Sequence, residues 1–305
     1  MAINSLEYSR VFQTQLDQQV VHEATSGWME SNAGDVKYSG GSEIKIPTIG
    51  TTGLGDYDRD DGFPQGSVSF SYQAHKMTQD RSASFQLDRM DVDETNFAAN
   101  ASAVMVEFQR EHVIPEVDAY RYSKLASLAI AASRKTVYTP VADDILKKLL
   151  ADIAQVKDIV GDNSEIVITM SIPVSNILNS TSGIERKIVL SDFKQGEINL
   201  KIGRIDNNPI IVVPSARMKT GYTFYDGRTD GQKQGGFIAT EDAKNINWIL
   251  CTHRTPIAVS KTDKMRIFDP DTNQRADAWK IDYRKYHDLW VKEKQLNNLW
   301  VNISE

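Results

Sequence analysis

Apolar and polar residues alternate in several segments between residues 44 and 87, a pattern typical of one-faced β-strands. The clearest alternations place these apolar residues opposite Ser and Gln: Val68, Phe70, Tyr72, Ala74, Ala83, Phe85 and Leu87. A shorter alternation at Ile44 and Ile46 is predicted to end at Pro47 and Gly50, because proline cannot donate a hydrogen bond to a sheet. Together these strands predict a long, hairpin-like projection.

The segment between these strands, residues 50–66, is rich in Gly, Asp and Thr. Its only aromatic residues are Tyr57 and Phe63. It cannot bury enough apolar area by itself to offset the entropy cost of ordering its backbone. Loops this long without structure of their own are uncommon in compact domains. We therefore expect the tip of the projection to be covered by a partner molecule.

After the projection, the spacing of apolar residues changes from that of a strand to that of a helix. Apolar residues recur at helical spacing from Phe97 to Leu128, and acidic residues crowd the start of this segment, where they complement the helix dipole. A helix over residues 93–133 would be roughly 60 Å long at 1.5 Å per residue. Pro115 removes a backbone donor and disfavours helical geometry at Ile114, which predicts a kink or a break there.

The remaining pattern predicts a mixed α+β domain. A helix is expected to open at Thr139-Pro140 and to end at Gly161. Buried strands are expected at residues 165–170, 210–213, 247–251 and 256–259, a short helix at 173–178, and aromatic-rich alternation at 279–290. Phe12, Leu16 and Val20 could line one face of a short N-terminal helix.

The search for catalytic chemistry is negative. The histidines are scattered without metal-ligand spacing, and there is no phosphate-binding Gly-Lys-Ser/Thr run and no Gly-x-Ser-x-Gly elbow. The acidic turns at 56–61 and 269–271 are similar to calcium loops but lack the required Gly and Glu positions. Solvated turns are the preferred interpretation, and weak cation binding at an assembled interface stays open. We expect no catalytic residue, no cofactor and no bound metal.

Composition narrows the class of protein further. The chain has 305 residues, 40% hydrophobic and 25% charged, which fits a folded protein of about two domains. A net charge of −6 argues against a dedicated nucleic-acid binder. The single cysteine, Cys251, lies in an apolar run, so a core thiol is expected, and disulfide frameworks and Cys-based zinc sites are excluded. We expect no transmembrane helix and no signal peptide, and hence a reducing cytoplasm.

Four stretches, in this order, resemble the major capsid proteins of tailed bacteriophages, which share the Hong Kong 97-type fold. They are the projection at 44–87, the run from Val113 to Arg121, the run from Gly203 to Met218, and the run from Tyr283 to Asp288. They match, respectively, that family's extended loop, its spine helix, a strand-turn-strand of its axial domain, and a returning strand of its peripheral domain.

The resemblance implies an α+β Hong Kong 97-type capsid fold with five parts. These are an N-terminal arm (1–40), an extended β-hairpin loop (41–92), the spine helix of the peripheral domain (93–139), a mixed α+β axial domain (140–261) and C-terminal strands returning to the peripheral domain (262–305).

It also implies self-assembly into homo-pentamers and homo-hexamers that form an icosahedral head shell. The expected partners are further copies of the chain, a portal protein, packaged double-stranded DNA in non-specific contact, and a separate scaffolding protein, because only about forty residues precede the loop. The expected location is the virion, with assembly in the host cytoplasm and no membrane. We expect assembly contacts from residues on the loop and the spine helix: Tyr57, Arg59, Phe63, Lys76, Arg81, Glu116 and Arg121.

Two alternatives remain open on the sequence. One is a cellular nanocompartment shell of the encapsulin type, with the same fold but with a groove for cargo peptides and no DNA packaging. The other is a metal-dependent hydrolase that uses the acidic turns at 56–61 or 269–271, against which the histidine spacing weighs.

Overall fold

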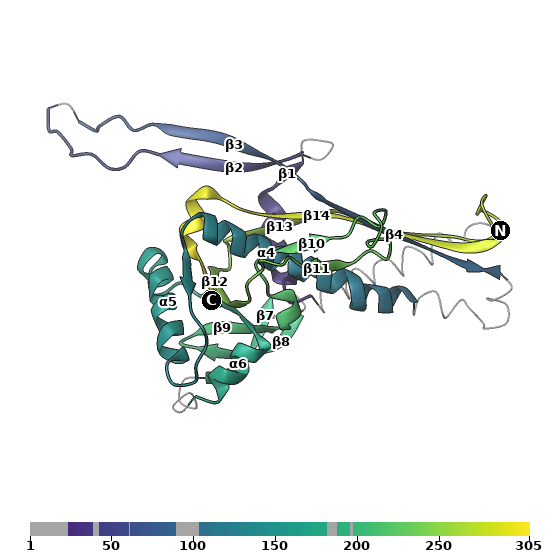
Figure 1. The fold of residues 1–305 in the computed structure, drawn as a ribbon. Helices are drawn as coiled ribbons and strands as arrows, with labels where there is room; N and C mark the ends of the chain where they lie inside the picture. The colour runs from purple at the N-terminus through teal and green to yellow at the C-terminus, as the bar shows by residue number, and fades with distance from the viewer. Residues whose placement is uncertain (1–23, 39–42, 61, 90–103, 182–187, 196–197) are drawn as a thin grey trace.

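The computed structural model describes residues 24–38, 43–60, 62–89, 104–181, 188–195 and 198–305. The architecture is α+β, with a large sheet flanked by helices, a small sheet covered by one long helix, and a hairpin that projects from both (Figure 1). The expected helix around Phe12 and the first part of the expected spine helix lie outside the described residues.

The large sheet has seven strands in the order β5-β15-β12-β6-β9-β8-β7. Their bounds are β5 Lys135–Val137, β6 Ile166–Ser171, β7 Ile188–Gln195, β8 Ile198–Ile205, β9 Asn208–Val213, β12 Ile246–Thr252 and β15 Leu299–Ile303. The β6–β9 and β5–β15 pairs are parallel and the others are antiparallel. Every residue of β6 is buried, as expected of a strand covered on both faces.

Three helices pack against this sheet: α5 (Ile145–Val160), α6 (Ile172–Asn179) and the C-terminal half of α4 (Ile114–Ala131), whose Leu125 and Ala129 share the core of the sheet. The expected helix start at Thr139-Pro140 is wrong. Residues 138–144 instead form a turn in which the hydroxyl of Tyr138 donates to Asp144 at 2.5 Å and accepts from the backbone of Val141 at 3.0 Å. The predicted end is confirmed, because Gly161 caps α5 with a φ of 88° that favours glycine.

A buried carboxylate joins α5 to the large sheet. Asp152 on α5 accepts hydrogen bonds from Trp248 Nε1 at 3.0 Å and Asn302 Nδ2 at 2.9 Å. Its other oxygen accepts from Thr136 Oγ1 at 2.9 Å. Three strands are thus tied to one helix by a satisfied polar group.

The small sheet has the order β13-β14-β4, from β13 (Pro256–Phe268), β14 (Ala278–Val291) and β4 (Gln79–Asp88). The expected pairing of residues 82–87 within the projection is wrong. β4 pairs with β14 along its whole length, from His287 opposite Gln79 to Ala278 opposite Asp88. The apolar face of β4 is half-buried here, against residues from a distant part of the chain, and not in the hairpin.

The long helix covers one face of the small sheet. Residues 104–108 are helical, η2 (Gln109–Val113) is a π-helical turn, and α4 runs over Ile114–Ala131. Met105, Val113 and Val117 pack against Ile281 and Tyr283 of the sheet. Of the kink or break predicted at Pro115, the break is wrong: the helix continues through the proline, directly after the π-helical turn.

The projection is a hairpin of β2 (Glu43–Thr51) and β3 (Val68–Lys76), with β1 (Lys37–Tyr38) beside the base of β2. The prediction that the first strand ends at Pro47 is wrong, because β2 continues through it to Thr51. β1 pairs with β2 only at Ile44 and Lys45, so β2 is an edge strand at Pro47, and edge strands tolerate proline.

The remaining elements are short: η1 (Gly27–Asp35), η4 (Ser215–Arg217), β10 (Tyr222–Phe224), β11 (Phe237–Ala239) and η5 (Glu293–Asn298). β15 belongs to the large sheet, so the range 262–305 contributes strands to both sheets and not only to the small one. Within the described residues, no helix has the length and apolar character needed to cross a membrane.

Candidate assembly surfaces

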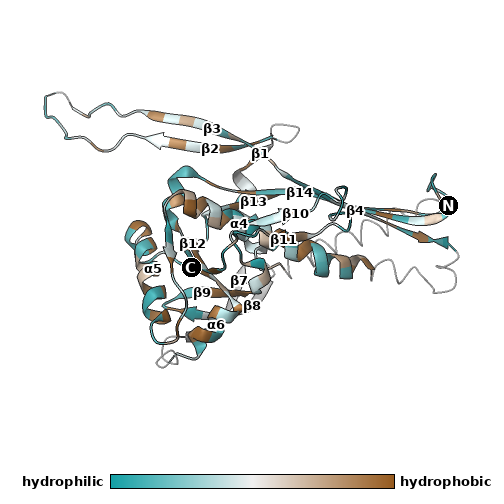
Figure 2. Cartoon of the chain, in the orientation of Figure 1, coloured by the Kyte–Doolittle hydropathy of each residue, from teal (hydrophilic) through white to brown (hydrophobic). Residues whose placement is uncertain are grey.

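The hairpin tip has no core of its own. Its large apolar side chains are exposed: Ile49 58%, Leu54 107%, Tyr57 60%, Phe63 87%, Val68 75% and Phe70 58%. The ring contacts among them are local, with Tyr57 and Phe63 packed edge to face at 5.1 Å and Phe70 packed edge to face on Tyr72 at 5.0 Å. Figure 2 shows the hairpin of β2 and β3, with hydrophobic positions along its strands, extending away from the rest of the chain. Exposed apolar area on this scale marks an interaction surface.

The base of the hairpin, by contrast, is firmly anchored. Ile44 and Ile46 are buried with Ile257, Val259 and Trp290. Further along β2, Lys294 Nζ donates to the carbonyl of Ile49 at 2.7 Å. A rigid base and an uncovered tip fit an arm that reaches a neighbour.

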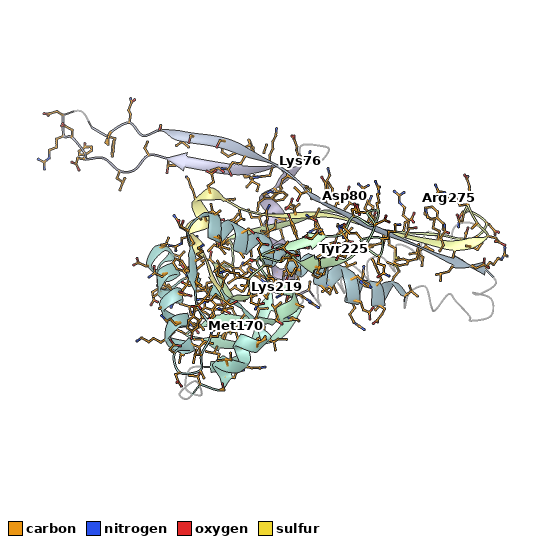
Figure 3. The ribbon with its side chains drawn as sticks, in the orientation of Figure 1. Lys76, Asp80, Met170, Lys219, Tyr225 and Arg275 are labelled. Atoms are coloured by element: carbon orange, nitrogen blue, oxygen red, sulfur yellow. The ribbon has the colours of Figure 1, made fainter. Side chains whose placement is uncertain are left out.

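Arg81 and Glu116, two of the expected assembly contacts, lie together within the chain. Arg81 Nε donates to Glu116 Oε1 at 2.5 Å, and Nη2 donates to Oε2 at 3.2 Å. Arg81 also donates to the carbonyls of Tyr225, at 2.6 Å, and Gly236, at 3.4 Å. The pair thus joins β4, α4 and both ends of the 225–236 loop. Figure 3 labels Tyr225, at the start of this loop, and Asp80, which precedes Arg81 on β4.

The 225–236 loop is internally ordered. Asp226 accepts hydrogen bonds from the backbone of Thr229 at 2.9 Å, the hydroxyl of Thr229 at 2.7 Å and the backbone of Arg228 at 2.8 Å. These bonds lower the pKa of Asp226 to about 2. The loop, β4 and the helix around His112 and Glu116 enclose a groove of about 740 Å³.

Arg121, a third expected contact, is only 1% exposed. Its guanidinium pairs with Glu30 and donates to the carbonyl of Ser26 at 3.1 Å. Beside it, Asp118 is fully buried and accepts from the backbone and hydroxyl of both Thr25 and Ser26. Arg121 therefore fastens residues 25–30 to α4 and is not exposed to a neighbour.

A second buried polar cluster lies where β4, β14 and α4 meet. Asp288 accepts from the Tyr120 hydroxyl at 2.5 Å and from the backbone and hydroxyl of Thr78 at 2.8 and 3.0 Å. Next to it, burial lowers the pKa of His287 well below its ordinary value, and the nearby charges of Arg121, Lys285 and Arg81 lower it further.

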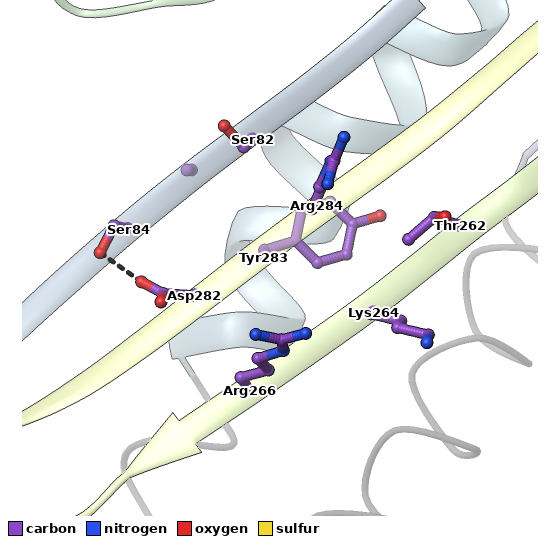
Figure 4. Close-up of a pocket in the computed structure, with 9 residues that line it drawn as sticks. Ser82, Ser84, Thr262, Lys264, Arg266, Asp282, Tyr283 and Arg284 are labelled. Carbon is purple, nitrogen blue, oxygen red and sulfur yellow. Dashed lines mark hydrogen bonds between the residues drawn. The ribbon is translucent and has the colours of Figure 1, made fainter. Parts of the chain in front are cut away.

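The face of the small sheet opposite the helix is polar and basic. Register places Lys264 beside Arg284 and Ser82, and Arg266 beside Asp282 and Ser84. A groove of about 500 Å³ crosses these two rows (Figure 4). Ser84 Oγ donates to Asp282 Oδ1 at 2.6 Å across the strands.

The acidic turns do not form a metal site in the part of the chain that the structure describes. Asp58 accepts from the backbone of Asp60 at 2.8 Å, and Asp269 accepts from the backbone of Thr272 at 2.9 Å, as in ordinary polar turns. No group of three His, Cys, Asp or Glu residues could hold a metal ion among the described residues. Cys251 is buried, which raises the pKa of its thiol to about 12.

The expected contact residues thus fall into three groups. Tyr57, Arg59, Phe63 and Lys76 are exposed on the hairpin, Arg81 and Glu116 pair with each other, and Arg121 is buried. Sequence reasoning missed Asp118 and Asp288, which organise two buried polar clusters. In the sequence, each of these two aspartates lies next to apolar residues of its own helix or strand. That placement was the signal by which their burial could have been predicted.

Comparisons with known proteins agree with this geometry. No protein-family model matches the sequence, and no curated protein matches it. Solved structures do. The asymmetric unit of the bacteriophage PhiM1 mature capsid is 11% identical with a TM-score of 0.56, covering 87% of this chain and 82% of that chain. The capsid of cyanophage P-SCSP1u is 11% identical with a TM-score of 0.56, covering 88% and 85%. A structure from Gordonia phage Cozz is 13% identical with a TM-score of 0.55, covering 86% and 81%.

At these identities the likeness establishes the fold. The chain has the α+β fold of phage capsid proteins over most of its length, as the resemblance to the Hong Kong 97-type fold predicted.

Proposed function

We propose that this protein is a major capsid protein, the subunit that assembles into the icosahedral head shell of a tailed phage. The observation that carries the proposal is the hairpin, whose base is buried and whose tip exposes Leu54, Tyr57 and Phe63 without cover. Such a tip is stable only when other molecules cover it, and identical copies can supply that cover in a repeating shell.

In this proposal the chain forms homo-pentamers and homo-hexamers around packaged double-stranded DNA. The DNA contact is non-specific, since a net charge of −6 limits adhesion to phosphate. A separate scaffolding protein and a portal protein complete the assembly, which takes place in the host cytoplasm and ends in the virion. The five parts at 1–40, 41–92, 93–139, 140–261 and 262–305 would serve as arm, loop, spine, axial domain and returning strands.

Imaging the purified chain in vitrified ice tests the proposal. We expect closed shells, or rings of five and six copies, whose assembly depends on protein concentration. A stable monomer at all concentrations, with or without added scaffold, contradicts the proposal. Shells that form in cells and enclose a cargo enzyme instead of DNA would favour the nanocompartment alternative.

A further inference from the structure

The hairpin joins the small sheet through a very short connection. β3 ends at Lys76 and β4 begins at Gln79, so only Met77 and Thr78 lie between them. Because β3 and β4 belong to different sheets, the φ and ψ angles of these two residues set the angle between the hairpin and the small sheet at this connection (Figure 1). We call Met77 and Thr78 the link.

Small changes in the link are amplified along the hairpin. β3 has nine residues, which span about 30 Å at about 3.3 Å per residue, so a rotation of about 20° at the link moves the far end of the strand by about 10 Å. The tip, residues 52–67, lies beyond that end. The direction of the hairpin is therefore well defined only if the link is held.

One buried carboxylate holds the link. Asp288 Oδ2 accepts hydrogen bonds from the backbone N–H of Thr78 at 2.8 Å and from its hydroxyl at 3.0 Å. Asp288 Oδ1 accepts from the hydroxyl of Tyr120 on α4 at 2.5 Å and from the backbone of Leu289 at 2.7 Å. Thr78 itself is exposed, so water would compete for both of its donors without this partner. The link, α4 and β14 thus meet at one side chain.

Met77 is held mainly by packing. Its side chain is 3% exposed and belongs to the apolar cluster at the base of the hairpin, and its carbonyl accepts from the Tyr286 hydroxyl at 3.2 Å. Apolar packing is non-directional and keeps the base in place, whereas hydrogen bonds need particular angles between donor and acceptor. The bonds between Asp288 and Thr78 therefore contribute most to the angle of the link.

The hydrogen-bond donors around Asp288 are all uncharged. Asp288 is 1% exposed, and its donors are two hydroxyls and two backbone N–H groups. Burying a carboxylate among neutral donors costs free energy that an apolar side chain of the same size would not. The carboxylate adds geometry instead, because both of its oxygens only accept and each binds two donors at once. Its charge is better explained by the need for one arrangement of the link than by stability.

We propose that Asp288 is a positioning residue: by binding Thr78 and Tyr120 together, it sets the direction in which the hairpin leaves the body of the chain. This role belongs to the single copy and goes beyond the proposed function. Its consequence for shells rests on the proposed function: where copies assemble, one hairpin direction in every copy gives particles of uniform diameter.

The first experiment measures the hairpin direction in dispersed chains. Spin labels are placed at two exposed positions, Ser71→Cys on β3 and Ser127→Cys on α4, and pulsed electron paramagnetic resonance records the distribution of distances between them. The natural Cys251 is buried and takes no label. Dilution with unlabelled chain removes distances between copies. The otherwise unmodified chain should give one narrow peak.

Asp288→Asn should widen this peak by about twofold or more, because an amide has only one acceptor oxygen for the four bonds. Thr78→Val is a milder variant that removes only the hydroxyl, and it should widen the peak less. The matched control is Asp152→Asn, which also removes a buried carboxylate but lies on α5, away from the hairpin. It should lower stability and leave the peak narrow.

Peaks of equal width in Asp288→Asn, Thr78→Val and the unmodified chain overturn the inference, as does equal widening by Asp152→Asn. If Asp288→Asn does not fold, Thr78→Val decides in the same way.

The second experiment compares particle diameters in vitrified ice. Asp288→Asn should still form particles, because the exposed tip is unchanged, but with a spread of diameters at least about twice that of the unmodified chain. An equal spread overturns the consequence for shells. Failure of the unmodified chain to assemble overturns the proposed function, whereas the spin-label result does not depend on assembly and still decides the role of Asp288.

Discussion

Arg81 on β4 and Glu116 on α4 form a two-pronged ion pair, with 2.5 Å between Nε and Oε1 and 3.2 Å between Nη2 and Oε2. Because Arg81 also binds the carbonyls of Tyr225 and Gly236, this single side chain fixes the 225–236 loop to the long helix and the small sheet.

Arg81→Met should therefore destabilise the 225–236 loop more than the rest of the fold. The variant leaves Glu116 and two carbonyls unpaired in a largely enclosed site, which costs about 1–3 kcal/mol. Hydrogen exchange should accelerate at residues 225–236 more than in β6. Arg284→Met, which removes an exposed ion pair with Asp80, is the control and should leave exchange in the loop unchanged. Equal acceleration in both variants would contradict the role of Arg81.

Asp118→Asn should release residues 25–30 from α4. The buried carboxylate accepts four hydrogen bonds from Thr25 and Ser26 and pairs with Arg217 at 3.1 Å. An amide keeps the shape but loses the charge and half of the acceptors, so the free energy of unfolding should fall by about 2–4 kcal/mol. Limited proteolysis should cut near residues 24–36 sooner than in the control Asp158→Asn, an exposed position on α5. Unchanged cleavage would show that the segment is held by other contacts.

Stability should fall as the pH drops below about 6.5, the ordinary pKa of histidine. His287 is buried and its pKa is lowered, so below this pH the unfolded chain binds a proton that the folded chain does not. The loss reaches about 1.4 kcal/mol per pH unit for one such group, and it continues until the pH falls to the folded pKa. His75 and His253, whose pKa values are also lowered by burial, act in the same direction.

Urea unfolding between pH 7.5 and 5.5 measures the slope of the free energy of unfolding against pH. His287→Gln should reduce the slope by up to one proton. His112→Gln, at an exposed position, should leave the slope as it is. A slope that is the same in His287→Gln and in the unmodified chain would contradict the prediction.

Deleting residues 50–66 should leave the folded body intact but prevent closed shells. None of the described residues of the deleted tip belongs to the buried clusters, so the melting temperature should change little. A gentler variant, with Leu54, Tyr57 and Phe63 each changed to Ser, should weaken assembly as well, whereas Val141→Ser, an exposed site elsewhere, should not. Normal particles from the deletion variant would be incompatible with the proposed role of the tip.

Ile211→Asp should unfold the large sheet. Ile211 is 3% exposed in β9 and lies opposite Thr169 of β6, so the substitution buries an unpaired charge and costs more than about 4 kcal/mol. The neighbouring Val212→Asp is the matched control, because Val212 is 43% exposed. Solubility and circular dichroism should separate the two variants. Equal behaviour would contradict the assigned burial of β9.

The sequence predicted where helices and strands lie better than it predicted which strands pair with each other. Alternation identified the strands at 68–74 and 82–87, an unbroken apolar run identified the strand at 210–213, and Gly161 marked a helix end. Alternation tells which side chains share a face but not which strand lies alongside, so the pairing of β4 with β14 was missed. Pro115 predicted a kink or a break, because a local rule does not foresee a π-helical turn after which the helix continues.

The candidate assembly surfaces were also predictable only in part, where the signal lies in one continuous segment of the sequence. The tip was recognised because a polar, glycine-rich segment without core residues is visible in the sequence itself. Arg81 and Glu116 were singled out, but their pairing across 35 positions depends on the packing of β4 against the helix. The roles of Asp118 and Asp288 likewise depend on segments that lie far away in the sequence.

The position of β15 also affects the order in which the protein folds during synthesis. β15 lies inside the large sheet, between β5 and β12, although it follows both of them in the sequence. Until Ile303 has left the ribosome, the nascent chain holds β5 and β12 with open edges and cannot complete this sheet. Completion of the large sheet is thereby delayed until all of its other strands have been made.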